Sequence, residues 1–187
     1  MKGEVDWVRW LCSSIQPCLA NDGLSIECGK RLLYTAQVAG YRVLSNGDVE
    51  EPVFDKGTSY QTDVLVGEQT DDRWVPRLVV ECKKGQVTTH DALTYSTKAA
   101  SHKTVHPSLR YGLLLGDFAD PLPKRLLRHG HNFDFMIAVP NEDVSAEHLN
   151  QIVQLVLAEV AASRKIGDIL SGKQKVRFLH RGLETSL

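Results

Sequence analysis

Arg77-Leu78-Val79-Val80-Glu81-Cys82-Lys83 is the stretch that decides the fold, because an apolar run passes directly into an acid, a cysteine and a base. Its aliphatic and β-branched residues are typical of a buried strand. Successive side chains of a strand point to opposite faces, so Glu81 and Lys83 project from one face and Cys82 from the other. The sequence therefore predicts an acid and a lysine side by side at the end of a core strand.

A second short strand is predicted at residues 63–67, and it opens with Asp63, 18 residues before Glu81. The segment between the strands, 67–76, is rich in turn-forming and charged residues, so the two strands are expected to form a hairpin. Asp63 would then join Glu81 and Lys83. Carboxylates are ligands that Mg²⁺ uses, and Mg²⁺ keeps other positions for water and phosphate. Ordinary explanations stay open, because most acid-x-base triplets are solvated ion pairs and an Asp at a strand start is usually a turn residue.

Asp63 followed by Glu81-Cys82-Lys83 resembles the signature of the PD-(D/E)xK nuclease superfamily, with Thr62 in place of the usual Pro. The resemblance covers roughly residues 24–140 of the chain. It implies an α/β (α+β) fold with a restriction-endonuclease-like core, in which helices flank a mixed central β-sheet. The implied activity is divalent-metal-dependent hydrolysis of DNA phosphodiester bonds, of restriction or repair type. The implied cofactor is Mg²⁺, for which Mn²⁺ can substitute. A nucleotide cofactor is not expected, because the sequence has no Walker-type glycine loop.

The resemblance also implies a role for each site residue. Asp63 and Glu81 would bind the metal together with the backbone carbonyl of Cys82, and Lys83 would position the attacking water or take its proton. Glu27 is a further candidate, because residues 25–40 are predicted to form the first core helix, which often supplies an acid in this superfamily. The alternative for Glu27 is structural, since the first turn of a helix favours acids and Lys30 and Arg31 stand at helical pairing distance.

The charge distribution indicates where DNA would bind. The net charge is −1, but residues 1–82 carry 8 basic and 13 acidic side chains, whereas residues 83–131 carry 8 basic and 3 acidic ones. Phosphate contacts from basic side chains supply most non-specific affinity for DNA. The candidates closest to the motif in sequence are Lys84, Gln86, Lys98 and Lys103. A second basic group lies near the C-terminus and comprises Arg164, Lys165, Lys173, Lys175, Arg177 and Arg181. For any single residue, an ordinary solvated surface remains the alternative.

Hydrophobic spacing predicts the remaining elements. Helices are expected at 4–20, broken near Pro17, at 25–40, at 88–102, at 123–130, and after a capping Ser145. Asn46-Gly47 predicts a two-residue hairpin between strands 41–45 and 48–54. Further strands are expected at 111–115 and 133–139. The chain is expected to form a single nuclease-like domain over residues 1–187, with helix 4–20 and the segment 145–187 added to a core of about 24–140.

The four cysteines match no zinc template, and a reduced, buried thiol is the expectation for each. The longest apolar runs are far shorter than the roughly 20 residues that span a bilayer, and the first residues lack a signal-peptide pattern. A cytoplasmic location without membrane association is therefore expected.

Two further alternatives remain open. The chain could be a non-catalytic nuclease-fold module for DNA binding or assembly instead of an enzyme. The active species could also be a homodimer, because two-fold dimers are the commonest assembly. Leu155 and Leu157 lie beyond the main apolar face of the last helix, where they could either contact a partner or complete the monomer core.

Overall fold

A computed structural model describes residues 3–70, 72–140 and 144–179, and its centre is a five-stranded mixed sheet. In spatial order the strands are β1 (Leu24–Cys28), β6 (Val64–Gln69), β7 (Trp74–Lys84), β8 (Arg110–Gly116) and β9 (Phe135–Ala138). β6 runs antiparallel to its two neighbours, β1 and β7, whereas β8 runs parallel to both β7 and β9. The predicted hairpin between residues 63–67 and 77–83 is confirmed as β6 and β7.

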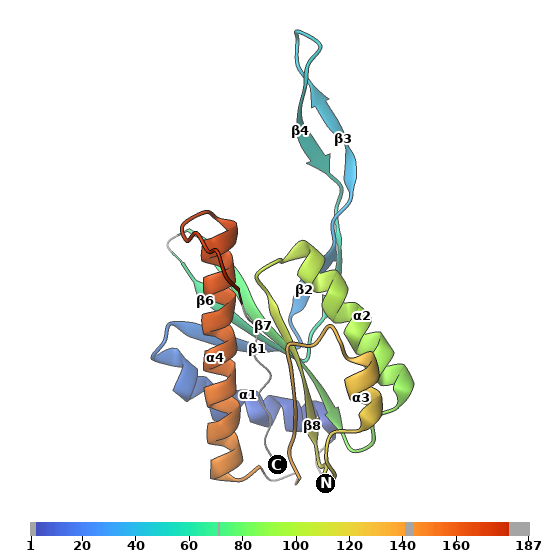
Figure 1. Cartoon of the computed structure of the whole chain (residues 1–187), viewed down its shortest axis with the longest axis vertical. Helices are drawn as coiled ribbons and strands as arrows, with labels where there is room; N and C mark the ends of the chain where they lie inside the picture. Colours follow the sequence, from blue (N-terminus) through green and yellow to red (C-terminus); the bar gives the residue numbers. More distant parts are fainter. Residues whose placement is uncertain (1–2, 71, 141–143, 180–187) are drawn as a thin grey trace.

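Helices cover both faces of this sheet (Figure 1). α1 (Glu4–Ala20) and α4 (Ala146–Leu170) pack on one face, where their apolar side chains share a core with Val64, Val80 and Cys82. α2 (Thr89–Val105) and α3 (Lys124–His129) lie on the other face, over Val79, Tyr111 and Leu113. The predicted mixed α/β architecture with a mixed central sheet between helices is confirmed.

The alternation along β7 assigns each side chain of the motif to one of these layers. Cys82 is 1% exposed and belongs to the α1/α4 core together with Leu78 and Val80. Val79 belongs to the opposite core, beneath α2, and Glu81 follows it on that face. Cys82 therefore points into the core as predicted, and the acid of the motif points toward α2.

The prediction of a helix over residues 25–40 is wrong. The segment forms β1, then β2 (Arg31–Thr35) and the start of β3 (Val38–Val43), and Gly29 turns between β1 and β2 at φ +67°. β2 pairs with β5 (Thr58–Gln61), and β3 pairs with β4 (Val49–Phe54). The i, i+3 and i+4 spacing of a few apolar residues indicated a helix, but the β-branched and aromatic residues of this segment instead find partners across a long hairpin.

This hairpin has two parts. Its lower part, β2 with β5, packs against α2, and its upper part extends away from the body (Figure 1). The upper part is referred to below as the arm and consists of β3, β4 and the turn between them. The hairpin signal of Asn46-Gly47 is confirmed, although the turn spans three residues, 45–47, with Gly47 at φ +88° and Leu44 paired to Asp48.

The other predicted helices and strands are present, with shifted ends. α1 continues through Pro17 instead of breaking there. α2 begins with a capping box between Thr88 and Asp91, and α4 begins at the capping side chain of Ser145. On α4, Leu157 packs against the monomer core and Leu155 lines a small apolar pocket. Leu157 therefore contributes to the monomer core, and both leucines remain half-buried.

A disulfide joins Cys12 of α1 to Cys28 of β1, so the expectation of reduced thiols is wrong for these two residues. Cys82 is free and buried as expected, and Cys18 is free but exposed. Cytosolic proteins rarely keep disulfides, so this bond weighs against the predicted cytoplasmic location. Among the described helices, none combines the length and apolar character that crossing a bilayer requires.

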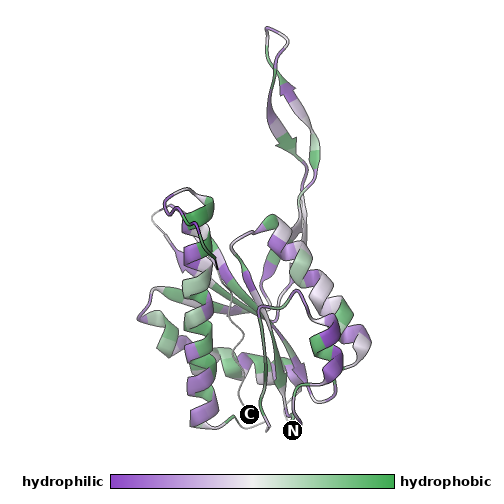
Figure 2. Cartoon of the chain, in the orientation of Figure 1, coloured by the Kyte–Doolittle hydropathy of each residue, from purple (hydrophilic) through white to green (hydrophobic). Residues whose placement is uncertain are grey.

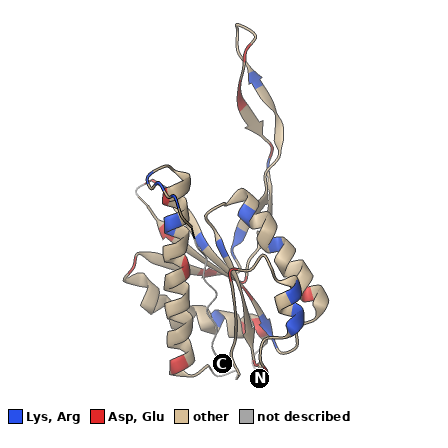
Figure 3. Cartoon of the chain, in the orientation of Figure 1, with Lys and Arg blue, Asp and Glu red and all other residues tan. Residues whose placement is uncertain are grey.

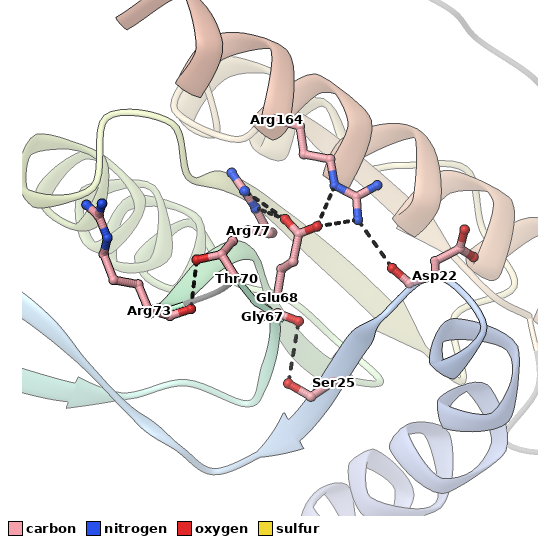
Figure 4. Close-up of polar contacts among 8 residues, drawn as sticks. All are labelled: Asp22, Ser25, Gly67, Glu68, Thr70, Arg73, Arg77 and Arg164. Atoms are coloured by element: carbon pink, nitrogen blue, oxygen red, sulfur yellow. Dashed lines mark hydrogen bonds and ion pairs between the residues drawn. The ribbon is translucent and has the colours of Figure 1, made fainter. Parts of the chain in front are cut away.

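A cluster of charges fixes α4 to the far end of the β6–β7 hairpin (Figure 4). Glu68 accepts hydrogen bonds from Arg77 at 2.7 Å and from Arg164 at 2.7 and 3.0 Å, and Arg164 also contacts the backbone carbonyl of Asp22. Burial acts to raise the pKa of Glu68, but the hydrogen bonds from Arg164 and Arg77 outweigh it and hold the pKa below its ordinary value of 4.5. Glu68 therefore stabilises the fold as a carboxylate.

We predict that Glu68→Gln lowers the free energy of unfolding at pH 7 by about 1–2 kcal/mol, because a charge-assisted contact to two arginines is lost. The folded-state pKa of Glu68 is depressed, so its contribution is present above pH 4.5 and is lost as the pH falls through the folded-state value. Urea unfolding of both proteins at pH 7 and pH 3 checks this. An equal difference at both pH values would contradict an ionic contribution.

Candidate active site

Glu81 is the most deeply buried acid of the motif, with 2% of its surface exposed. The ammonium of Lys98, on α2, donates to both carboxylate oxygens at 3.0 and 3.1 Å. The hydroxyl of Tyr111, on β8, donates to Oε1 at 2.5 Å. Two elements, α2 and β8, thus hold this carboxylate in one orientation.

Asp63 lies beside Glu81. Val64 pairs with Val80, and extending this register by one residue places Asp63 opposite Glu81. Its Oδ2 accepts the backbone N–H of Cys82 at 2.8 Å, and its carbonyl accepts the N–H of Gly29 at 3.1 Å. Asp63 is therefore held on both sides, and the two carboxylates meet where β6 begins and β7 ends.

Lys83 follows Glu81 on the same face of β7 and is 28% exposed. Its Nζ lies 3.7 Å from Oε2 of Glu4, and the same oxygen accepts the backbone N–H of Lys84 at 2.9 Å. Glu4 is in the first turn of α1, which approaches the end of β7. Sequence reasoning missed Glu4, because nothing in the sequence near it signals a contact with a strand that is some 80 residues away.

Glu27 is not on a helix. It lies on β1 opposite Leu65, and its side chain pairs with Lys30, the structural partner that the sequence also suggested. Across the sheet, Glu27 lies in line with Leu65 of β6 and Val79 of β7, and not with Glu81. Two strands, β6 and β7, separate Glu27 from β8. The acid that a helix brings to the motif is Glu4, on the helix that precedes β1.

Burial and like charge raise the pKa of both motif carboxylates. For Asp63, burial is the main cause, opposed by the Cys82 hydrogen bond and by Lys98 and reinforced by Glu4. For Glu81, burial again raises the pKa, Lys98 lowers it, and Asp63 raises it. Paired carboxylates with raised pKa values are typical of sites that bind a cation or exchange a proton.

Aromatic side chains support the site from beneath α2. Tyr111 stacks on His102 at 5.6 Å between ring centroids, and His102 meets Tyr34 edge-on at 5.3 Å. Burial lowers the pKa of His102 to about 4, so its ring is neutral at neutral pH. Lys98 lies 5.5 Å and 5.8 Å from the ring centroids of Tyr95 and Tyr60. The orientation of Tyr111, and hence of Glu81, depends on this packing.

Within the described residues, no group of three or more His, Cys, Asp or Glu side chains is close enough to hold a metal by itself. Asp63 and Glu81 provide two adjacent carboxylates. One or two carboxylates with water and phosphate satisfy Mg²⁺, so this pair fits that ion without a third side chain. The backbone carbonyl of Cys82 stays a predicted third ligand.

The four DNA-contact candidates have different environments. Lys98 is bound to Glu81, and Lys103 pairs with Asp134 at 2.7 Å. The side chain of Gln86 is exposed just after β7, and that of Lys84 is partly exposed. Gln86 and Lys84 thus lie at the end of the strand that carries the motif, and Lys98 and Lys103 pair with acids whose side chains are buried.

Many cations of the basic middle segment are likewise paired internally. Arg110 contacts both Asp134 and Glu159. From the C-terminal group, Arg164 pairs with Glu68, and Arg181 lies outside the described residues. The other four members of the C-terminal group, Lys165, Lys173, Lys175 and Arg177, are exposed, and so are Lys124, Arg125 and Arg128 on α3. The three cations on α3 form a basic surface beside α2 (Figure 3).

Comparison with known proteins adds no family assignment: the chain matches no protein-family model and no curated protein at a significant level.

We predict that Asp63→Asn raises the free energy of unfolding at pH 7 without metal, by on the order of 1 kcal/mol. Asn keeps an acceptor for the Cys82 N–H but removes a buried charge beside Glu81. An acid with a raised folded-state pKa costs stability once the pH exceeds its ordinary value, 3.8 for Asp63, and the cost grows up to the folded-state pKa. The advantage of Asn should therefore disappear below about pH 4.

Thermal unfolding across pH 3–8 checks this prediction. Glu81→Gln is the informative comparison, because it leaves the Lys98 ammonium, which is 17% exposed, without its carboxylate. The raised pKa of Glu81 also favours a neutral side chain, but the Lys98 charge left without its partner offsets part of that gain, so this variant should gain less stability at pH 7 than Asp63→Asn. An equal gain from both substitutions would show that Lys98 does not hold Glu81 in solution.

Proposed function

We propose that the chain is a Mg²⁺-dependent endodeoxyribonuclease with a restriction-endonuclease-like core. The observation that carries the proposal is the meeting of Asp63 and Glu81 at the end of β7, with raised pKa values and with Lys83 next on the same face. The resemblance of these residues to the PD-(D/E)xK signature supports the assignment, and so does the position of Glu4 on a helix before the sheet.

Asp63 and Glu81 would hold the metal, with the Cys82 carbonyl as a third ligand. A bound Mg²⁺ would polarise the scissile phosphate and lower the pKa of a coordinated water. The hydrogen bond from the Cys82 N–H fixes the Asp63 carboxylate before any metal arrives. Preorganisation of this kind reduces the reorganisation required during the reaction.

The two lysines of the site have different positions and therefore different proposed roles. Lys98 neutralises Glu81 directly and would share or yield that carboxylate when a metal binds. Lys83 is more exposed and contacts Glu4 at 3.7 Å, a long contact that leaves its ammonium able to turn toward a water or phosphate. We assign the orientation of the attacking water to Lys83 and the positioning of Glu81 to Lys98.

The DNA backbone would run from the end of β7 across the exposed cations of α3. Val87 follows Lys84 and Gln86 and packs in the same cluster as Leu126 of α3. The loop after β7 and the basic helix are therefore neighbours on the α2 face. Lys84, Gln86, Lys124, Arg125 and Arg128 are the proposed phosphate contacts. Because these contacts are mainly ionic, binding should weaken as salt increases.

A non-catalytic DNA-binding or assembly module is the second candidate, and one observation favours it. Lys98 and Tyr111 satisfy Glu81 without any metal, as in a structural ion pair. If the pair is structural, Mn²⁺ will not bind at Asp63 and Glu81. Calorimetric titration with Mn²⁺ therefore separates the two candidates before any substrate is tested.

We predict Mg²⁺- or Mn²⁺-dependent cleavage of plasmid DNA, and a loss of at least about 100-fold in rate for both Asp63→Asn and Lys83→Ala. Lys83→Ala should change DNA affinity little, because several exposed cations remain. Gel assays of supercoiled plasmid measure cleavage, and fluorescence anisotropy measures affinity.

Asp72→Asn is the matched control, since Asp72 is 73% exposed at the opposite end of the same hairpin. It should cleave like the wild type. Metal-dependent cleavage that survives in both Asp63→Asn and Lys83→Ala would overturn the assignment of the site.

A separate prediction concerns Glu4. Glu4→Gln should slow cleavage by roughly 10-fold, because Lys83 loses the carboxylate that positions it, while Mn²⁺ affinity falls far less than in Asp63→Asn. Comparing the rate at saturating metal with the calorimetric affinity tests this. Asp6→Asn, on the exposed side of the same helical turn, is the control. Equal losses of metal affinity in Glu4→Gln and Asp63→Asn would instead make Glu4 a metal ligand.

A further inference from the structure

The arm leaves a large amount of apolar surface uncovered. Among its exposed side chains, Val43 is 65%, Phe54 63%, Val49 61%, Tyr41 59% and Val38 48% exposed. Figure 2 shows hydrophobic segments on both strands of the arm, beyond the body of the molecule. An isolated two-stranded ribbon is only marginally stable in water. A ribbon of this kind gains stability if another surface covers it.

The register gathers this apolar surface on one face. Residues that pair across strands share a face, as do residues i and i+2 of one strand. Val49 pairs with Val43, and Tyr41 is two residues from Val43. Tyr41 pairs with Pro52, Phe54 is two residues further, and Phe54 pairs with Val38. Six residues therefore share one face of the arm across the register shifts at 38/40 and 41/43, namely Val38, Tyr41, Val43, Val49, Pro52 and Phe54. Pro52 is exposed as well.

The opposite face of the arm is polar by the same relation. Arg42 lies between Tyr41 and Val43, Glu50 follows Val49, and Glu51 precedes Pro52, so all three point away from the apolar face. Residues 36–56 contain four acidic and two basic side chains. A β-ribbon of this size can enter the DNA major groove, but here the apolar face carries no cation and the acids of the arm outnumber its bases, which disfavours contact with phosphates.

We propose that the apolar face of the arm binds the same face of a second copy of this chain. The face carries no charge, so two copies can meet without bringing like charges together, and an isologous contact needs only this one surface. The exposed fractions correspond to on the order of 500 Å² per copy, at the upper end of what monomers leave uncovered. Two faces together would bury about 1,000 Å², the lower bound of a specific interface.

The surface continues at the base of the arm. Phe54 lines a hollow of about 410 Å³ together with Tyr34, Thr35, Ala36, Ser101, Thr104 and Val105. If two arms pair in antiparallel fashion, the turn of one arm reaches toward this hollow of the other, and the central pair of Tyr41 and Pro52 lies next to the two-fold axis. The hollow thus adds to the contact area on both copies.

Two valines on opposite faces of the arm provide a matched test. Val43 lies on the apolar face, whereas Val53 pairs with Gly40 on the polar face and is 48% exposed. By sedimentation of the full-length chain, we expect a monomer–dimer equilibrium for the wild type. Val43→Lys should raise the dissociation constant at least about 10-fold, and Val53→Lys should change it less than about 2-fold. The proposal is overturned if the wild type stays monomeric over a 100-fold range of concentration that extends to the highest attainable one. It is also overturned if Val43→Lys and Val53→Lys change the dissociation constant equally.

Cysteine trapping tests the geometry independently. In a Cys18→Ser background, which removes the exposed free thiol, Tyr41→Cys should form a disulfide-linked dimer under mild oxidation and Val53→Cys should not. Linkage through Val53→Cys alone would overturn the assigned face. The association is measured without DNA cleavage, so the two proposals can fail separately. A dimer that does not cleave DNA refutes the proposed nuclease function and leaves the dimer standing. A monomer that cleaves DNA refutes the dimer and leaves the nuclease function standing.

Discussion

The hydrogen bond from the Cys82 N–H to the Asp63 carboxylate is the interaction on which the arrangement of the site depends. It joins the start of β6 to the end of β7 beyond their last paired residues, Val64 and Val80. Because this hydrogen bond fixes the end of the hairpin, the alternation of side chains along β7 determines the face toward which each one points. Cys82 enters the core beneath α1 and α4, and Glu81 must face α2. β7 thus contributes side chains to the cores on both faces of the sheet and presents Glu81 on the α2 face.

Burying Glu81 has an energetic cost that two neighbouring elements offset. A carboxylate that is 2% exposed requires partners, and Lys98 and Tyr111 supply them from α2 and β8. Removing only one of these partners leaves a buried charge, which is usually worse than never burying it. The pKa of Glu81 is nevertheless raised, because burial and Asp63 outweigh Lys98. In the proposed function, a metal would supply the positive charge that this carboxylate pair still lacks.

Local patterns predicted the parts of this fold that depend on local physics. The alternation of β7, the Asn46-Gly47 hairpin, the helix from residue 88 and the Ser145 cap all follow from neighbouring residues, and each is present. The segment 25–40 was misread because its apolar spacing fits a helix, while its strand partners are tens of residues away. Glu4 and Lys98 reach the site only through tertiary packing, so no spacing near the motif could have identified them.

Charge pairing also explains how a chain of net charge −1 could still bind DNA. Three of the eight cations of the basic middle segment are paired with acids whose side chains are buried: Lys98 with Glu81, and Lys103 and Arg110 with Asp134. Their charges hold elements together and contribute little to the field outside. The exposed cations of this segment, Lys124, Arg125 and Arg128, lie on α3, while the exposed acids of the arm lie at the other end of α2 (Figure 3). A separation of this kind would direct a polyanion to the end of β7 and keep it away from the apolar face of the arm.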